Sequence, residues 1–121
     1  MVKTLLLSAV LLAGLHTSLA AQTVPGSGAF YVQACHSLAA NDASASNDLI
    51  LPSFYCAIDI DDLSGVGRIL PADSRFCKPA DVTLPQMAGV AAAYLDAHAD
   101  RQSESFMTLA GNAFHEKWPC P

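Results

Sequence analysis

Histidines are the residues of this sequence whose type best suits metal binding or acid–base chemistry. Of the four histidines in the chain, His36, His98 and His115 lie beyond residue 20. None of the three is four residues from another, so no H-x-x-x-H or H-E-x-x-H pattern places two ligands on one helix face. We therefore expect structural or surface roles for these histidines, and neither a metal site nor a cofactor.

The acidic run Asp59, Asp61 and Asp62 is the next candidate for chemistry. A calcium loop would require an oxygen ligand at its fifth position and a glycine at its sixth, but the fifth position is Leu63 and no glycine follows it. Two roles remain, a solvated helix face or an acidic patch that meets cationic groups of a partner protein. In the second case we expect the contact residues to be these three aspartates together with Arg68.

Patterns that carry catalysis are absent from the sequence. No serine stands in a G-x-S-x-G turn, and no two cysteines form a C-x-x-C redox pair. Glycoside hydrolysis would require two carboxylates across a cleft, for which a few short helices leave little room. We expect a protein without catalytic residues, and a small hydrolase is the least favoured class.

The cysteines indicate an oxidising compartment. The chain has four of them, Cys35, Cys56, Cys77 and Cys120. No two are two to four residues apart, as a zinc knuckle would require. An even number in a short exported chain is typical of two disulfides, and free buried thiols are the alternative.

The N-terminus supplies the export pattern. Lys3 precedes an apolar run that continues to Leu15, and Ser18 and Ala20 are the small residues that precede a cleavage site. Residues 1–20 therefore predict a signal peptide. The apolar run is shorter than the about 20 residues that a membrane-spanning helix requires, which disfavours the alternative of a retained anchor.

Composition narrows the range of partners. The chain has 6 Lys and Arg against 11 Asp and Glu, which gives a formal net charge of −5 at pH 7, and it contains no basic cluster. Nucleic acid and anionic membranes are therefore poor partners, whereas a basic protein surface suits this charge. The length predicts one domain, and the oligomeric state stays open, a homodimer included.

Helical periodicity organises the first half of the mature chain. Residues 21–28 are rich in glycine and proline and predict a flexible lead-in, and residues 29–121 form the domain. An apolar stripe predicts a helix over about 29–40, and the polar run 41–47 predicts a loop. The segment after Pro52 fits both a strand and a helix, and we favour a helix that ends at Gly65 or Gly67, followed by a loop over 68–75.

Helix caps organise the second half. Thr83 and Gln86 have the spacing of a capping box, and Pro85 is tolerated in a first turn, so a third helix begins here. A fourth helix is predicted from about Ser103, and Pro119 ends it. The expected fold is all-α, a small disulfide-bonded bundle of about four helices.

Hairpin geometry favours one of the three ways to pair four cysteines. If the third and fourth helices run antiparallel, the start of one lies beside the end of the other, which brings Cys77 close to Cys120. The remaining bridge then joins Cys35 to Cys56 across the first hairpin.

A further pattern surrounds the third cysteine, and it resembles a known family. Phe76-Cys77-Lys78-Pro79 is followed by Val82-Thr83, Gln86, Val90 and Tyr94-Leu95, and later by Leu109, Ala113 and Trp118-Pro119-Cys120. From about residue 30 to residue 120 this is similar to the Rap/Tai family of immunity proteins. The match is poorer after Cys56, where the family has a glycine and an aromatic residue but this chain has Ala57, Ile58 and Asp59.

The resemblance implies a function that the residues alone do not. Members of the family are periplasmic helical proteins that bind and block peptidoglycan amidase effectors of type VI secretion systems. We therefore expect an exported inhibitor, found in the periplasm, whose partner is such an effector and which has no activity of its own. The alternative is a general envelope chaperone or stress protein built on the same helical frame.

Overall fold

The structure is a computed structural model that describes residues 24–41 and 47–121. The expected signal peptide, its cleavage position and most of the expected 41–47 loop lie outside these residues. The elements, in chain order, are α1 (Gly28–Ala40), α2 (Asn47–Val66), the 3-10 turn η1 (Gly67–Ile69), α3 (Leu84–Ala97), the 3-10 turn η2 (Ala99–Arg101) and α4 (Phe106–Lys117). In the described part the only β-type pairings are two isolated bridges, so the all-α prediction is confirmed.

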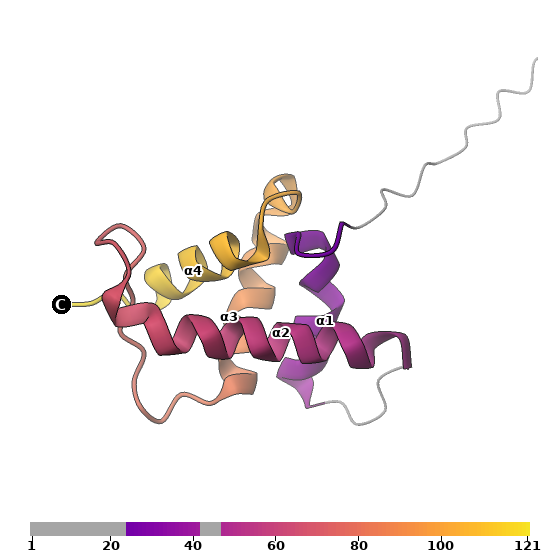
Figure 1. The fold of residues 1–121 in the computed structure, drawn as a ribbon, viewed down its shortest axis with the longest axis horizontal. Coiled ribbons are helices and arrows are strands. Elements are labelled where there is room, and N and C mark those ends of the chain that lie inside the picture. The colour runs from indigo at the N-terminus through magenta and orange to yellow at the C-terminus, as the bar shows by residue number, and fades with distance from the viewer. Residues whose placement is uncertain (1–23, 42–46) are drawn as a thin grey trace, which may run out of the picture.

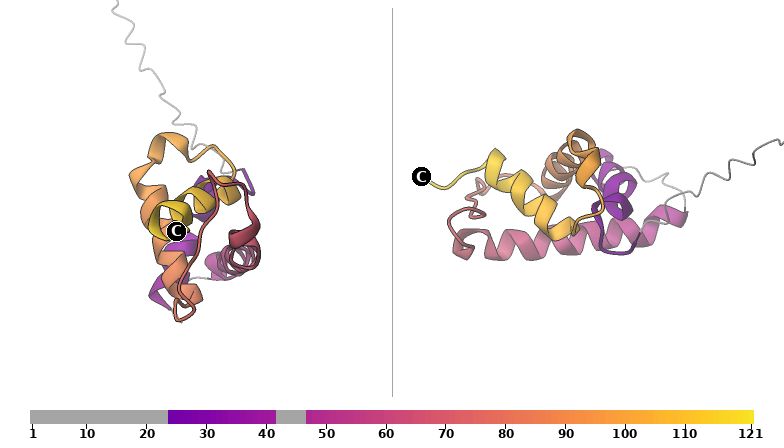
Figure 2. Two further views of the ribbon diagram at one scale, coloured as in Figure 1. Left: turned by 90° about the vertical axis from the view of Figure 1, so that its left-hand side faces the viewer. Right: turned by 90° about the horizontal axis from the view of Figure 1, so that it is seen from above.

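The helices form two layers around one core. α1 packs along α3, α4 packs against α3 and runs away from α1, and the long α2 forms the outer layer on one side (Figures 1 and 2). The contact between α1 and α3 uses small side chains, with Ala34, Ala88 and Ala91 fully buried. Small residues let two helix backbones approach closely, which explains why α1 and α3 form the centre of the molecule. None of the described helices combines the length and apolarity required to cross a bilayer.

α2 begins earlier than the sequence predicted. We expected its start after Pro52, but the helix starts at Asn47 and includes this proline. A proline inside a helix removes the hydrogen bond to the carbonyl four residues before it, here that of Asp48. Because Asp48 is exposed, water can satisfy the free carbonyl, and the cost is small enough for the helix to continue through Pro52.

α3 begins with the capping box that its sequence predicted. The backbone N–H of Thr83 donates to Oε1 of Gln86 at 2.8 Å, and the backbone N–H of Gln86 donates to the Thr83 hydroxyl at 3.4 Å. Pro85 lies in the first turn, where its missing N–H has no helical partner to lose.

α4 begins at Phe106, three residues after the expected start near Ser103. The preceding carbonyls serve α1 instead: Gln102 O accepts from Ala29 N, and Glu104 O accepts from Gly28 N, both at 2.9 Å. The first N–H groups of a helix have no partner within it. The connection between α3 and α4 therefore caps α1 and does not join α4.

Both expected disulfides are present. Cys35 is bonded to Cys56, which ties α1 to α2, and Cys77 is bonded to Cys120, which ties the segment before α3 to the end of the chain. The first bridge is fully buried, whereas the second is partly exposed. The pairing drawn from hairpin geometry is thus confirmed.

Candidate functional site

The outward side of α2 carries the largest group of exposed apolar side chains in the described part of the chain. Its members are between 40% and 61% exposed: Ile50, Leu51, Phe54, Tyr55 and Ile58. They recur three or four residues apart, so they form one continuous stripe along the helix. We call these five residues the outer face of α2.

This surface arises because α2 is apolar on two sides. Cys56, Ile60 and Leu63 repeat at helical spacing and are buried against the other helices. The side chains of the outer face stand on the other side and stay exposed, and the rings of Phe54 and Tyr55 lie 6.5 Å apart. Contiguous exposed apolar side chains on a small protein mark an interaction surface, and aromatic residues are common at the centres of protein interfaces.

Two of the predicted acidic contact residues extend the outer face. Asp61 and Asp62 are exposed, and they lie three and four residues after Ile58, on the same side of the helix. The stripe is therefore apolar over its first turns and negative over the next. Such a surface suits a partner with an apolar centre and a basic margin.

The structure gives Asp59 a different role. It is half-buried, and its carboxylate lies near the phenol of Tyr31 in α1. Burial, together with the nearby Asp59 carboxylate, raises the pKa of Tyr31 above its usual range. The same ring stacks on Phe106, with centroids 4.1 Å apart. Asp59 therefore helps to join α2 to α1 and does not face outward with Asp61 and Asp62.

Arg68 is separated from the acidic pair as well. It lies in η1, beyond the end of α2, and lines a cavity there. The structure thus brings together two of the four predicted contact residues, Asp61 and Asp62, and places the other two elsewhere.

Sequence reasoning missed the outer face itself. The residues were visible as an apolar run, but the run also contains the buried residues of α2, and the sequence does not say which side faces the core. The four-residue spacing of Ile50, Phe54 and Ile58 is the pattern that could have separated the two sides.

The histidines lie apart from one another and each has a structural partner. His36 Nε2 lies 2.8 Å from a carboxylate oxygen of Asp96, and both side chains are about half exposed. Nδ1 of His98 donates to the Tyr94 carbonyl at 2.8 Å, and Nδ1 of His115 donates to the Arg75 carbonyl at 2.7 Å. Within the described residues, no three histidine, cysteine or acidic side chains form a cluster that could hold a metal ion.

The fold and the outer face together define a small disulfide-tied helical protein with a surface suited to binding another protein. Comparison with known families agrees: the model of the Rap1a immunity proteins matches residues 27–120. The chain therefore belongs to the Rap1a immunity protein family, and the resemblance seen in its sequence is confirmed. No curated protein and no solved structure gives a significant match.

Proposed function

We propose that the protein is a periplasmic inhibitor that binds and blocks a peptidoglycan amidase effector of a type VI secretion system. The single observation that carries the binding role is the exposed apolar outer face of α2, which leads into Asp61 and Asp62. Family membership supports protection against a secreted effector. The export pattern of residues 1–20 and the two disulfides support an oxidising compartment outside the cytoplasm.

In this proposal the protein acts by occlusion and performs no chemistry. Phe54 and Tyr55 supply the central contacts, because large aromatic side chains bury much area for little conformational entropy. The acidic pair attracts a basic margin of the effector and speeds the encounter.

The test begins with capture. The mature chain, tagged at its N-terminus, is incubated with envelope and secreted fractions of the native organism, and bound proteins are identified by mass spectrometry. The purified partner is then assayed for peptidoglycan cleavage with and without the inhibitor. A single dominant partner whose amidase activity falls to zero at a fixed stoichiometry supports the proposal. Many unrelated clients, together with apolar dye binding that rises in acid, would support the chaperone alternative.

Matched variants locate the contact surface once the partner is in hand. Phe54→Asp should weaken the complex by more than about 30-fold, as expected for a central aromatic residue that contributes 2 kcal/mol or more. Met107→Asp is the control, because Met107 is an exposed apolar residue on a different helix, α4. Equal losses in both variants would refute the placement on α2. Sedimentation of the same proteins shows whether the chain forms a homodimer through this face.

A second pair of variants tests the acidic extension. Asp62→Lys should slow association and reduce its dependence on salt, whereas Asp100→Lys, an exposed acid in η2, should change neither. Unchanged kinetics in Asp62→Lys would remove the acidic pair from the interface.

A further inference from the structure

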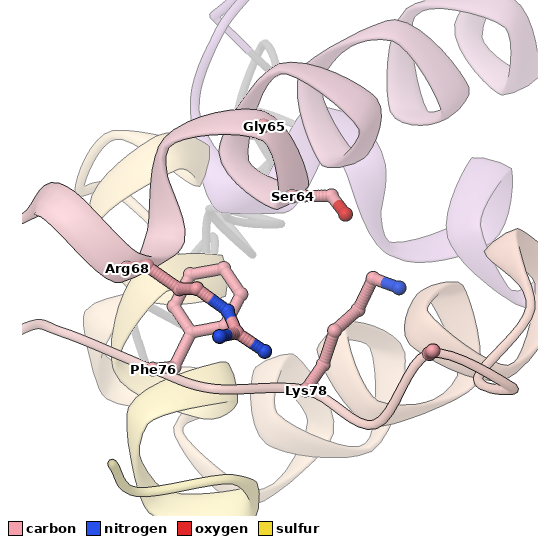
Figure 3. Close-up of a pocket in the computed structure, with 6 residues that line it drawn as sticks. Ser64, Gly65, Arg68, Phe76 and Lys78 are labelled. Atoms are coloured by element: carbon pink, nitrogen blue, oxygen red, sulfur yellow. The ribbon is translucent and has the colours of Figure 1, made fainter.

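A cavity of about 230 Å³ lies just beyond the outer face, between the end of α2 and the segment that leads to α3. It is lined by Ser64, Gly65, Arg68, Phe76, Lys78 and Ala80. Figure 3 shows the side chains of Ser64, Arg68 and Lys78 directed toward the same space. Ser64 lies in α2 and Arg68 in η1, whereas Lys78 lies in the segment that leads to α3.

The cavity concentrates positive charge in an acidic protein. The chain has only 6 Lys and Arg and a net charge of −5, yet two of these cations line this one small space. Elsewhere Arg101 is held by both carboxylate oxygens of Glu104 at 2.8 Å. Among the described residues, neither Arg68 nor Lys78 forms an ion pair. A hollow lined by charge of one sign attracts a counter-ion, so the cavity suits an anion.

The donors in the cavity are available to a ligand. Lys78 uses one hydrogen of its ammonium group, in a long 3.5 Å bond to the carbonyl of Val82, and retains two others. The guanidinium of Arg68 can donate two parallel hydrogen bonds, which matches the geometry of a carboxylate. The hydroxyl of Ser64 adds a neutral donor.

Gly65 keeps one wall of the cavity free of a side chain. A glycine within a helix costs about 1 kcal/mol relative to alanine. Gly65 is exposed and helical, and a Cβ added to it would meet no atom within 4 Å, so neither a turn nor a close approach requires glycine here. What its missing side chain does provide is an unobstructed wall of the cavity.

We propose that this cavity is a carboxylate-binding site and that its ligand is an aspartate or glutamate side chain of the bound effector. The ligand's carboxylate would lie between Arg68 and Lys78, and its aliphatic stem would contact Phe76 and Ala80. Phosphate is the competing anion, because guanidinium and ammonium groups bind phosphate as well as carboxylate, and the titration below distinguishes the two. This inference rests on the proposed function for the source of the carboxylate.

The site also fixes how a partner lies along α2. Arg68 follows α2 in η1, so α2 presents an apolar section and then negative charge, and the cavity after it presents positive charge. A partner must present positive charge opposite the acidic pair and negative charge opposite the cavity. A shift of the partner along the helix would place like charges together.

The binding site can be tested on the mature protein alone. N-acetyl-glutamate α-amide serves as the probe, N-acetyl-glutamine amide as its uncharged control, and inorganic phosphate as the competing anion, each titrated while backbone amide NMR signals are followed. The glutamate probe should shift the signals of Ser64, Gly65 and Lys78 in a saturable way. Absence of saturable shifts, or equal affinity for the glutamine control or for phosphate, would overturn the carboxylate assignment.

Variants separate a specific site from general attraction. Arg68→Gln and Lys78→Gln should each weaken probe binding about tenfold, in the range of a charged hydrogen bond, whereas Arg75→Gln should leave it unchanged because Arg75 donates to the Leu70 carbonyl. Gly65→Leu should block binding without loss of stability. Probe binding that survives Gly65→Leu would refute the site.

Failure of the site and failure of the proposed function give different results. Probe binding is measured without an effector, so it does not depend on which partner is captured. An effector complex whose affinity is unchanged by Arg68→Gln and by Gly65→Leu would overturn this site and leave the immunity role intact.

Discussion

Two glycines close together at the end of α2 should respond in opposite ways to the same substitution. A Cβ added to Gly67 would meet three ring atoms of Phe76 at 2.6, 2.7 and 2.9 Å, whereas a Cβ added to Gly65 would meet nothing within 4 Å. The Phe76 ring is 1% exposed and lies 5.2 Å from the ring of Phe114, so any movement of the ring would disturb this packed contact. Gly67→Ala therefore forces apart a packed contact.

The expected sizes follow from the two environments. Forcing one extra methyl group into a packed core costs about 1 to 3 kcal/mol, which for a domain of about 100 residues lowers Tm by roughly 4 to 20 °C. Gly65→Ala should raise stability by up to about 1 kcal/mol, because alanine favours the helix and restricts the unfolded chain. Both changes add one methyl group, so each variant is the other's control.

Thermal unfolding followed by circular dichroism measures the difference, and a third variant identifies its cause. In a Phe76→Leu background the smaller side chain leaves room for the new methyl group, so Gly67→Ala should cost less there than in the wild type. If Gly67→Ala is as stable as Gly65→Ala, or costs as much without the ring as with it, the close approach of Phe76 does not control this position.

Three further predictions concern the frame that holds the surface. Removing the second bridge with Cys77→Ser and Cys120→Ser should lower the free energy of unfolding by about 4 kcal/mol, from the chain entropy of a loop that spans 43 positions, and an unchanged denaturant midpoint would refute this. Thr83→Ala should cost about 1 kcal/mol through loss of the capping box, whereas Thr108→Ala, exposed within α4, should change stability by less than about 0.5 kcal/mol; equal effects would contradict the cap. Hydrogen bonds from Arg101 hold the pKa of Glu104 below its ordinary 4.5, so its contribution is present above that pH and disappears as pH falls through the lowered pKa. The stability difference between the wild type and Glu104→Gln should therefore shrink in acid, and a difference that grows in acid would show that the sign is wrong.

Features set by neighbours in the chain could be predicted from the sequence. The capping box of α3 joins Thr83 to Gln86, three residues apart, and the helical conformation of α2 follows from the spacing of its apolar residues. The pairing of the cysteines followed from helix order once the elements were placed. The family, too, was visible in the sequence, because its frame combines a bridge, a turn and a cap in a fixed order.

Features that depend on distant packing could not be predicted. The start of α4 is decided by α1, whose first N–H groups take the carbonyls of Gln102 and Glu104. The role of Asp59 is decided by Tyr31 on another helix. Neither partner can be read from local spacing, because each contact joins segments that meet only in the folded chain.

The candidate site likewise combines features that the sequence predicted with features that only the folded chain decided. The sequence by itself determined a small helical, disulfide-tied member of an immunity protein family, because periodicity, caps and cysteine number are properties of short segments. Only the tertiary structure decided which apolar side of α2 is buried, since α1 and the Cys35–Cys56 bridge orient that helix. It also decided that Arg68 and Lys78 share one cavity, because the chain reverses between them and packs Phe76 against Gly67.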